Sequence, residues 1–340
     1  MYRRTLFKME GSVRIFILIL MTYMLFPAIG VAAAVPELYL QLGYRTGDDF
    51  NRGKEIVFSQ DGQLLATVSG GASIKIWQTS SGREVATLTG HSAAIKNLAF
   101  LPDGRRIVSG SNDRTLKLWD ISSGRLIRSF QGHRGDIRAV AVSNDGALLA
   151  SAESNAVKVW ELDSGRLLAS IAAPGADGSS SGYIPPVMEL IFSPDSSKLI
   201  FANIQSSLFI VDLRQQRIVS AMTNRQLDCY TNLSLLGFDP EGKLIAGSLQ
   251  TLLFIDLERA AAVVKKSKIE VWIEYSAADG SFVAGPSHPK ASFVRVLDAN
   301  LSERLAIPQL GDAINRGYSP AAGLAAASFF DNQQIGRAHV

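Results

Sequence analysis

Short apolar stretches recur along most of the chain, and each is bounded by Gly, Ser, Asp or Asn. In the best-preserved part they come in groups of four. One precedes a tight-turn signal, one follows it, one ends in Trp, and one follows Ser-Gly-Arg. These stretches are rich in β-branched residues and are shorter than a typical helix. The pattern therefore predicts strands, for example at 95–100, 107–109 and 116–119.

A turn signal of the type Ser-Pro-Asp-Gly repeats at a nearly constant interval. Its acidic residue occurs six times, at steps of 38 to 50 residues, and a degenerate seventh copy lies at 319–323. Pro and Asp favour the bend of a tight turn and Gly accepts a positive φ, so each signal predicts a hairpin between two strands. The six acidic residues are Asp61, Asp103, Asp145, Asp195, Glu241 and Asp279.

Four short strands in a repeat of about 42 residues are the unit of a β-propeller blade. The seven turn signals therefore predict an all-β fold, a seven-bladed β-propeller, over residues 35–334. The seventh blade has predicted strands at 313–318 and 324–329, and its third strand should come from the chain after Asp331. Residues 335–340 match one reading frame of a common sequencing adapter, so we expect a non-native tail and an incomplete last blade.

Three of the repeats carry Trp at the end of their third strand, and two Gly-His dipeptides stand at the ends of fourth strands. Gly-His followed by Trp-Asp at this interval resembles the WD-repeat (WD40) family, over roughly residues 36–334. Later repeats keep the turns but lose Trp, as in Val211-Asp212. The motifs are Ile76-Trp77-Gln78, Leu118-Trp119-Asp120 and Val159-Trp160-Glu161, with Gly90-His91 and Gly132-His133.

The resemblance implies a buried hydrogen-bond network in each well-preserved blade, which joins a His, an Asp, a Ser or Thr, and the Trp indole. Unpaired polar groups there would cost about 1–3 kcal/mol each. In the third blade, Asn155 or Ser154 stands where an Asp is expected. We interpret the His residues as structural, not catalytic or metal-binding. The implied network is His91, Ser109, Asp113 and Trp119 in the second blade, His133, Ser151 and Trp160 in the third, and Thr67 and Trp77 in the first.

The segment Leu38–Tyr44 resembles Val85–His91, which contains a fourth strand followed by Gly-His. In the WD-repeat family an N-terminal strand completes the last blade. The resemblance therefore implies that residues 38–42 close the ring and leave no open sheet edge.

The N-terminal segment has the three-part layout of a secretory signal. A basic stretch, Met1–Arg14, precedes the apolar run Ile15–Ile29, and small residues follow up to Ala34. We expect residues 1–34 to be a signal peptide and the protein to be periplasmic or secreted. The alternative is an uncleaved anchor at 15–34, which would hold the propeller outside the cytoplasm at the inner membrane. In that case the N-terminal segment would be the only membrane contact.

Net charge changes the picture of possible partners. The chain carries +3 in total, but residues 1–34 hold four basic residues and one acidic residue, so the remainder is neutral. A neutral body gives no electrostatic reason to expect a nucleic-acid partner. The single cysteine, Cys229, lies in a polar stretch without a nearby His, and we do not interpret it as a nucleophile.

No phosphate-binding loop, nucleophile elbow or zinc-protease motif occurs in the sequence. We therefore expect no catalytic residues, no cofactor and no metal, and predict a non-catalytic protein-binding scaffold that presents a loop face to a protein partner. The candidate contact residues are Ser92, Asn112, Arg114 and Arg134.

Two other functions remain open at this point. The chain also resembles bacterial secreted proteins that join WD repeats to a caspase-like peptidase, so it could be the regulatory propeller of a larger enzyme. The other alternative is a small-molecule or carbohydrate binder that uses the central channel.

Overall fold

The computed structural model describes residues 56–174, 185–227, 229, 233–239, 241–248 and 251–259. For nine further strands, β1, β2 and β22 to β28, it describes the backbone alone. The expected signal peptide, apart from Ile15–Phe16, and the expected non-native tail at 335–340 lie outside the described residues.

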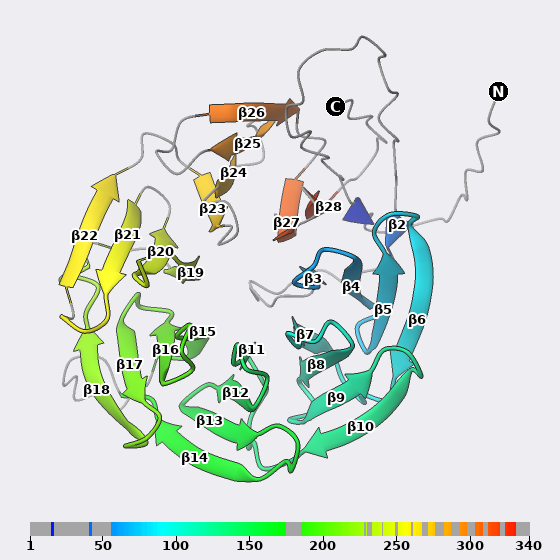
Figure 1. The fold of residues 1–340 in the computed structure, drawn as a ribbon, viewed down its shortest axis with the longest axis horizontal. Coiled ribbons are helices and arrows are strands. Elements are labelled where there is room, and N and C mark those ends of the chain that lie inside the picture. Colours follow the sequence, from blue (N-terminus) through cyan, green and yellow to red (C-terminus); the bar gives the residue numbers. More distant parts are fainter. Residues whose placement is uncertain are drawn as a thin grey trace.

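The described part of the chain is all-β, with strands that pair into four-stranded antiparallel sheets. In each of the first six sheets the four strands are consecutive in sequence. The sheets follow one another around a central axis, with the first strand of each nearest the axis and the fourth at the circumference (Figure 1). These sheets are β3 (Ile56–Phe58), β4 (Leu64–Ser69), β5 (Ser73–Gln78) and β6 (Arg83–Thr89); β7 (Ile95–Phe100), β8 (Arg106–Ser111), β9 (Leu116–Asp120) and β10 (Arg125–Phe130); and β11 (Ala139–Val142), β12 (Leu148–Glu153), β13 (Ala156–Glu161) and β14 (Leu167–Ala172).

The next three sheets continue the same order. They are β15 (Val187–Phe192), β16 (Lys198–Asn203), β17 (Leu208–Asp212) and β18 (Arg217–Met222); β19 (Ser234–Phe238), β20 (Leu244–Ser248), β21 (Thr251–Asp256) and β22 (Ala261–Lys266); and β23 (Val271–Tyr275), β24 (Phe282–Pro286), β25 (Phe293–Leu297) and β26 (Glu303–Pro308).

One more sheet combines the two ends of the chain. Its strand order is β27 (Asp312–Ser319), β28 (Leu324–Phe330), β1 (Ile15–Phe16) and β2 (Gln41–Leu42). The strands predicted for the seventh blade correspond to β27 and β28. The third position is held by β1 and not by chain after Asp331, which corrects that expectation. The unpaired backbone groups along the edge of β28 can accept any extended apolar segment, and β1 is such a segment.

The repeated turn signals form the hairpins predicted for them. In three sheets a serine hydroxyl donates to the aspartate two residues later and accepts the backbone N–H five residues later. For Ser59 these distances are 2.6 Å to Asp61 Oδ1 and 2.9 Å from Leu64 N. Ser143 and Ser193 repeat the arrangement with Asp145 and Asp195. The side chains therefore satisfy backbone groups that the bend removes from the ladder.

The core lies between neighbouring sheets. Ile74 and Leu88 of the first sheet share one buried cluster with Leu98 and Trp119 of the second. The second and third sheets pack closely at Gly110, where an added Cβ would lie 2.7 Å from Ile137 Cγ2 and 2.8 Å from Val140 Cγ2. Only glycine allows the sheets to approach so closely at this point.

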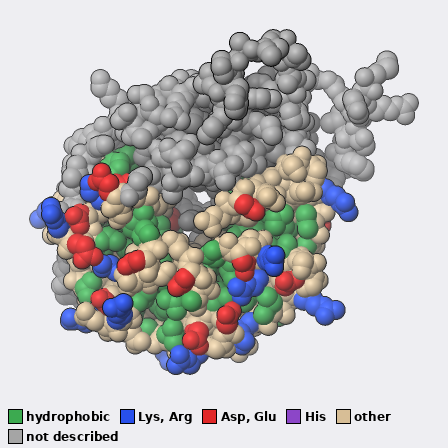
Figure 2. All heavy atoms as spheres, viewed as in Figure 1, with side chains coloured by type: hydrophobic (Ala, Val, Ile, Leu, Met, Phe, Trp, Pro, Cys, Tyr) green, Lys and Arg blue, Asp and Glu red, His purple; other side chains and the backbone are tan. Residues whose placement is uncertain are grey.

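Each of the outer strands β6, β10, β14 and β18 contains a β-bulge against its third strand. Bulges twist an edge strand away from regular pairing, so they protect exposed edges from joining other sheets. On the face seen in Figure 2, acidic and basic side chains of the described residues are interspersed. No helix in the described part of the chain is long and apolar enough to span a membrane.

Candidate functional site

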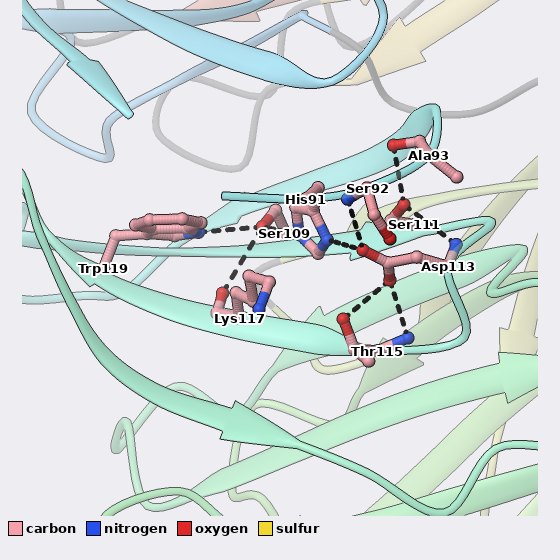
Figure 3. Close-up of polar contacts among 9 residues, drawn as sticks. All are labelled: His91, Ser92, Ala93, Ser109, Ser111, Asp113, Thr115, Lys117 and Trp119. Atoms are coloured by element: carbon pink, nitrogen blue, oxygen red, sulfur yellow. Dashed lines mark hydrogen bonds and ion pairs between the residues drawn. The ribbon is translucent and has the colours of Figure 1, made fainter. Parts of the chain in front are cut away.

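A chain of hydrogen bonds crosses the second sheet from Trp119 to Asp113 (Figure 3). The indole Nε1–H of Trp119 donates to Ser109 Oγ over 2.9 Å. The two nitrogens of His91 contact Ser109 Oγ and Asp113 Oδ2, each at 2.7 Å. Since a carboxylate only accepts, Nδ1–H of His91 donates to Asp113 and Nε2 accepts the Ser109 proton.

Burial and hydrogen bonding determine the ionisation states of His91 and Asp113. Burial lowers the pKa of His91 and keeps the ring neutral, although Asp113 acts in the opposite direction. Burial acts to raise the pKa of Asp113, but hydrogen bonds from Thr115, His91 and Ser92 outweigh it and hold that pKa below its usual range. The pair is therefore a neutral imidazole that donates to a carboxylate.

Asp113 also organises the exposed loops at this end of the sheet. Its Oδ2 accepts the Ser92 N–H at 3.1 Å, and its Oδ1 accepts the N–H and hydroxyl of Thr115 at 2.9 and 2.6 Å. One buried carboxylate thus ties the loop before β7 to the turn between β8 and β9. This turn also carries Asn112 and Arg114.

The glycine before each of these two histidines packs on the Trp ring. An added Cβ at Gly90 would lie 3.2 Å from Trp119 Cη2, and one at Gly132 would lie 3.5 Å from Trp160 Cη2. Both glycines have positive φ, 145° and 128°. Gly-His is therefore required by backbone geometry as well as by the hydrogen bonds of the histidine.

The third sheet has a similar series of hydrogen bonds, but its carboxylate is a glutamate. His133 Nε2 lies 2.7 Å from Ser151 Oγ, which accepts the Trp160 indole N–H over 2.9 Å. In the sequence, Asn155 or Ser154 stands where an Asp is expected, and the carboxylate of this sheet comes instead from Glu153. Glu153 is 5% exposed at the end of β12.

Glu153 binds backbone groups in preference to the imidazole. Its Oε2 accepts the N–H groups of Arg134 and Gly135 at 2.7 and 2.8 Å, while His133 Nδ1 lies 3.6 Å from the same atom. Nδ1 is buried without a hydrogen-bond partner. Burial lowers the pKa of His133 to about 4, although Glu153 acts to raise it.

In the first sheet only part of this hydrogen-bond network is present. Trp77 Nε1–H donates to Thr67 Oγ1 over 3.0 Å, and the ammonium of Lys75 lies 5.3 Å from the Trp77 ring centroid. Trp77 is half-buried, whereas Trp119 and Trp160 are 2% and 3% exposed.

The four candidate contact residues lie on the loops that this network holds. Ser92, Arg114 and Arg134 are exposed, and Asn112 is half-buried. Arg114 has φ of 67°, a left-handed conformation that an L-residue with a side chain rarely adopts.

Among the residues that the structure describes, no group of three or more His, Cys, Asp or Glu side chains could hold a metal ion. Cys229 is buried and forms no disulfide.

Repeated four-stranded antiparallel sheets around an axis, each of the best-preserved ones tied by a Trp–hydroxyl pair, define a repeat protein of the β-propeller type. Residues 54–78, 82–120 and 124–161 match the family model described as WD domain, G-beta repeat. These three segments are WD40 repeats, and the resemblance read from the sequence is confirmed there. A search of curated proteins found no match to the chain. WD40 repeats are generally non-catalytic and typically mediate protein–protein interactions.

Proposed function

We propose that this chain is a non-catalytic scaffold whose loop face, formed by the Gly-His loops and the turns between second and third strands, binds a protein partner. The observation that carries the proposal is the contrast within these loops. Their backbones are fixed from inside by Asp113 and Glu153, while Ser92, Arg114 and Arg134 are exposed. A rigid loop loses little conformational entropy when a partner binds.

We further propose that the sheets are the blades of a seven-bladed propeller closed by its N-terminal strand. The presence of β2 in the same sheet as β27 and β28 supports this closure. The strand β1, which stands between β2 and β28, lies within residues 1–34, so its removal would leave that position beside β28 for β2. A closed ring leaves no sheet edge between the first and last blades and gives the loop face a fixed shape.

We propose that the propeller works outside the cytoplasm, periplasmic or secreted, after removal of residues 1–34. Support comes from the basic, apolar and small-residue order of that segment. N-terminal sequencing of the protein from an extracytoplasmic fraction should begin near Val35. A cytosolic protein that begins at Met1 would contradict the proposal.

Site-specific photocrosslinking tests the binding face. A photoreactive amino acid in place of Ser92 should give a discrete adduct with one partner in cells that express the chain. The matched control carries the same amino acid in place of Gln60, an exposed residue in the hairpin turn at the opposite end of its sheet. Adducts only at Gln60, or at neither position, would contradict the proposed face.

A further inference from the structure

Three arginines lie in neighbouring loops at one end of the second and third sheets, and none of them has a carboxylate partner among the described residues. They are Arg114 and Arg134, which are exposed, and Arg138, which is half-buried. Within the described residues none of the three forms an ion pair; Arg138 Nε donates only to the Ser154 hydroxyl, at 3.2 Å. Among the other described arginines, Arg106, Arg166 and Arg259 lie within 4 Å of a carboxylate, whereas others such as Arg214 form no ion pair with a described residue.

A shared backbone acceptor brings the two loops side by side. The carbonyl of Ser111 accepts the N–H of Arg114 at 3.1 Å and the N–H of Ile137 at 3.3 Å. Ile137 directly precedes Arg138 and lies three residues after Arg134. The turn of one sheet and the loop of the next therefore form one continuous surface, which we call the arginine surface: Arg114, Arg134 and Arg138.

The acidic residues of these loops do not neutralise the arginine surface. In the described loops at this end of the two sheets the carboxylates are those of Asp113, Asp136 and Glu153. The side chains of Asp113 and Glu153 are 8% and 6% exposed and accept hydrogen bonds from histidine or loop backbone. Only Asp136 is exposed. Two exposed arginines and the half-buried Arg138 thus lie in loops where Asp136 is the one exposed carboxylate among the described residues.

The conformation of Arg114 is set by the turn that holds it. Arg114 has a φ of 67°, and Ser206, which has the same place in the turn between the second and third strands of the fourth sheet, has a φ of 59°. A side chain in this region costs free energy that glycine avoids, and such strain persists where surrounding contacts impose it. The hydrogen bonds of Asp113 to Thr115 and Ser92 are those contacts.

We propose that the arginine surface binds an acidic segment of the protein partner, with guanidinium groups donating to Asp or Glu carboxylates. Guanidinium presents a planar set of donors that matches a carboxylate, and exposed charges of one sign also speed the approach of an oppositely charged partner. This inference rests on the proposed function and names the chemistry of the partner.

Fluorescence anisotropy of the full chain with fluorescein-labelled octaglutamate, at about 50 mM salt, tests the proposal. Arg114→Gln, Arg134→Gln and Arg138→Gln should each weaken binding about threefold, and the triple variant about twentyfold. The matched control is Arg214→Gln in the turn between β17 and β18, an exposed arginine at the opposite end of its sheet, and it should bind like the wild type.

Arg114→Gly separates binding from folding. Glycine suits the positive φ, so this variant should melt no lower than the wild type and still bind octaglutamate about threefold more weakly. Absence of octaglutamate binding, or equal weakening by Arg214→Gln, would overturn the proposal. Tighter binding of a labelled single-stranded oligonucleotide through the same three arginines would also overturn it.

The photocrosslinking experiment and the anisotropy experiment test different claims, and a negative result in one is distinguishable from a negative result in the other. If a Ser92 adduct forms but octaglutamate does not bind, the scaffold survives and the acidic partner is wrong. If octaglutamate binds through the three arginines but no adduct forms, the surface chemistry stands and the proposed scaffold function does not.

Discussion

His133 Nδ1 lies 3.6 Å from Glu153 Oε2, whereas the corresponding atoms of His91 and Asp113 are 2.7 Å apart. In the third sheet the carboxylate belongs to Glu153 at the end of the second strand, whereas in the second sheet it belongs to Asp113 in the turn. Glu153 accepts hydrogen bonds from the loop backbone and none from His133. The second sheet therefore has a complete hydrogen-bond chain, and the third has a chain that stops at a buried nitrogen.

Replacement of Asp113 tests the complete chain. Asp113→Ala removes the acceptor for the buried Nδ1–H of His91 and for the Ser92 and Thr115 N–H groups. The free energy of unfolding should fall by about 1–3 kcal/mol. Asp136→Ala, at an exposed carboxylate of the neighbouring loop, should change it by less than about 0.5 kcal/mol. Urea unfolding of both variants measures the difference, and equal stabilities would show that Asp113 has no structural role.

Acid should destabilise the fold through the buried histidines. The pKa of His133 is about 4 in the folded state and 6.5 in its ordinary state, and that of His91 is lowered as well. Between pH 6.5 and 4 the unfolded chain takes up protons that the folded chain does not. The free energy of unfolding should therefore fall through this window, by about 3 kcal/mol from His133, and should gain nothing above it.

The carboxylates with lowered pKa lose their contribution only at the acid end of that window, so a variant isolates the histidine. His133→Gln should flatten the dependence of melting temperature on pH between 6.5 and 4, whatever its effect at neutral pH. A pH dependence identical to that of the wild type would mean that His133 titrates normally in the folded protein.

Gly110→Ala should weaken the packing of the second sheet against the third. The new Cβ would meet Ile137 and Val140 at distances below 3 Å, and neither contact is with the end of a flexible side chain. Overpacking of this kind costs about 1–3 kcal/mol. Gly135→Ala is the matched control, because its Cβ would meet only Glu153 Oε2, at 3.7 Å. Thermal unfolding that does not separate the two variants would exclude close sheet packing at Gly110.

The fold of the first repeats could be predicted because strand pattern and turn chemistry agree. The predicted strands at 95–100 and 116–119 correspond to β7 and β9. The strand predicted at 107–109 is longer, because β8 runs from Arg106 to Ser111. Ser109, Gly110 and Ser111 interrupt the apolar run, yet they are buried because hydrogen bonds and close sheet packing replace apolar contact.

The site could be predicted only where spacing is preserved. Asp113 lies four residues after Ser109, and the same spacing from Ser151 leads to Asn155. Glu153 lies only two residues after Ser151, and its longer side chain reaches the loop from the end of the strand. The alternation of buried and exposed positions gives no reason to expect a buried acid there. The place of β1 could not be predicted either, because backbone pairing with β28 requires no sequence motif.

The central claim of this account is that carboxylates inside the loop face fix its backbone, so that its arginines point outward. Hydrogen–deuterium exchange at the amides of Ser92, Arg134 and Gly135 tests it most directly. All three amides should be protected in the wild type. Glu153→Ala should expose Arg134 and Gly135 while Ser92, held by Asp113, stays protected. Exchange of all three at the rate of an unstructured chain in the wild type would contradict the account.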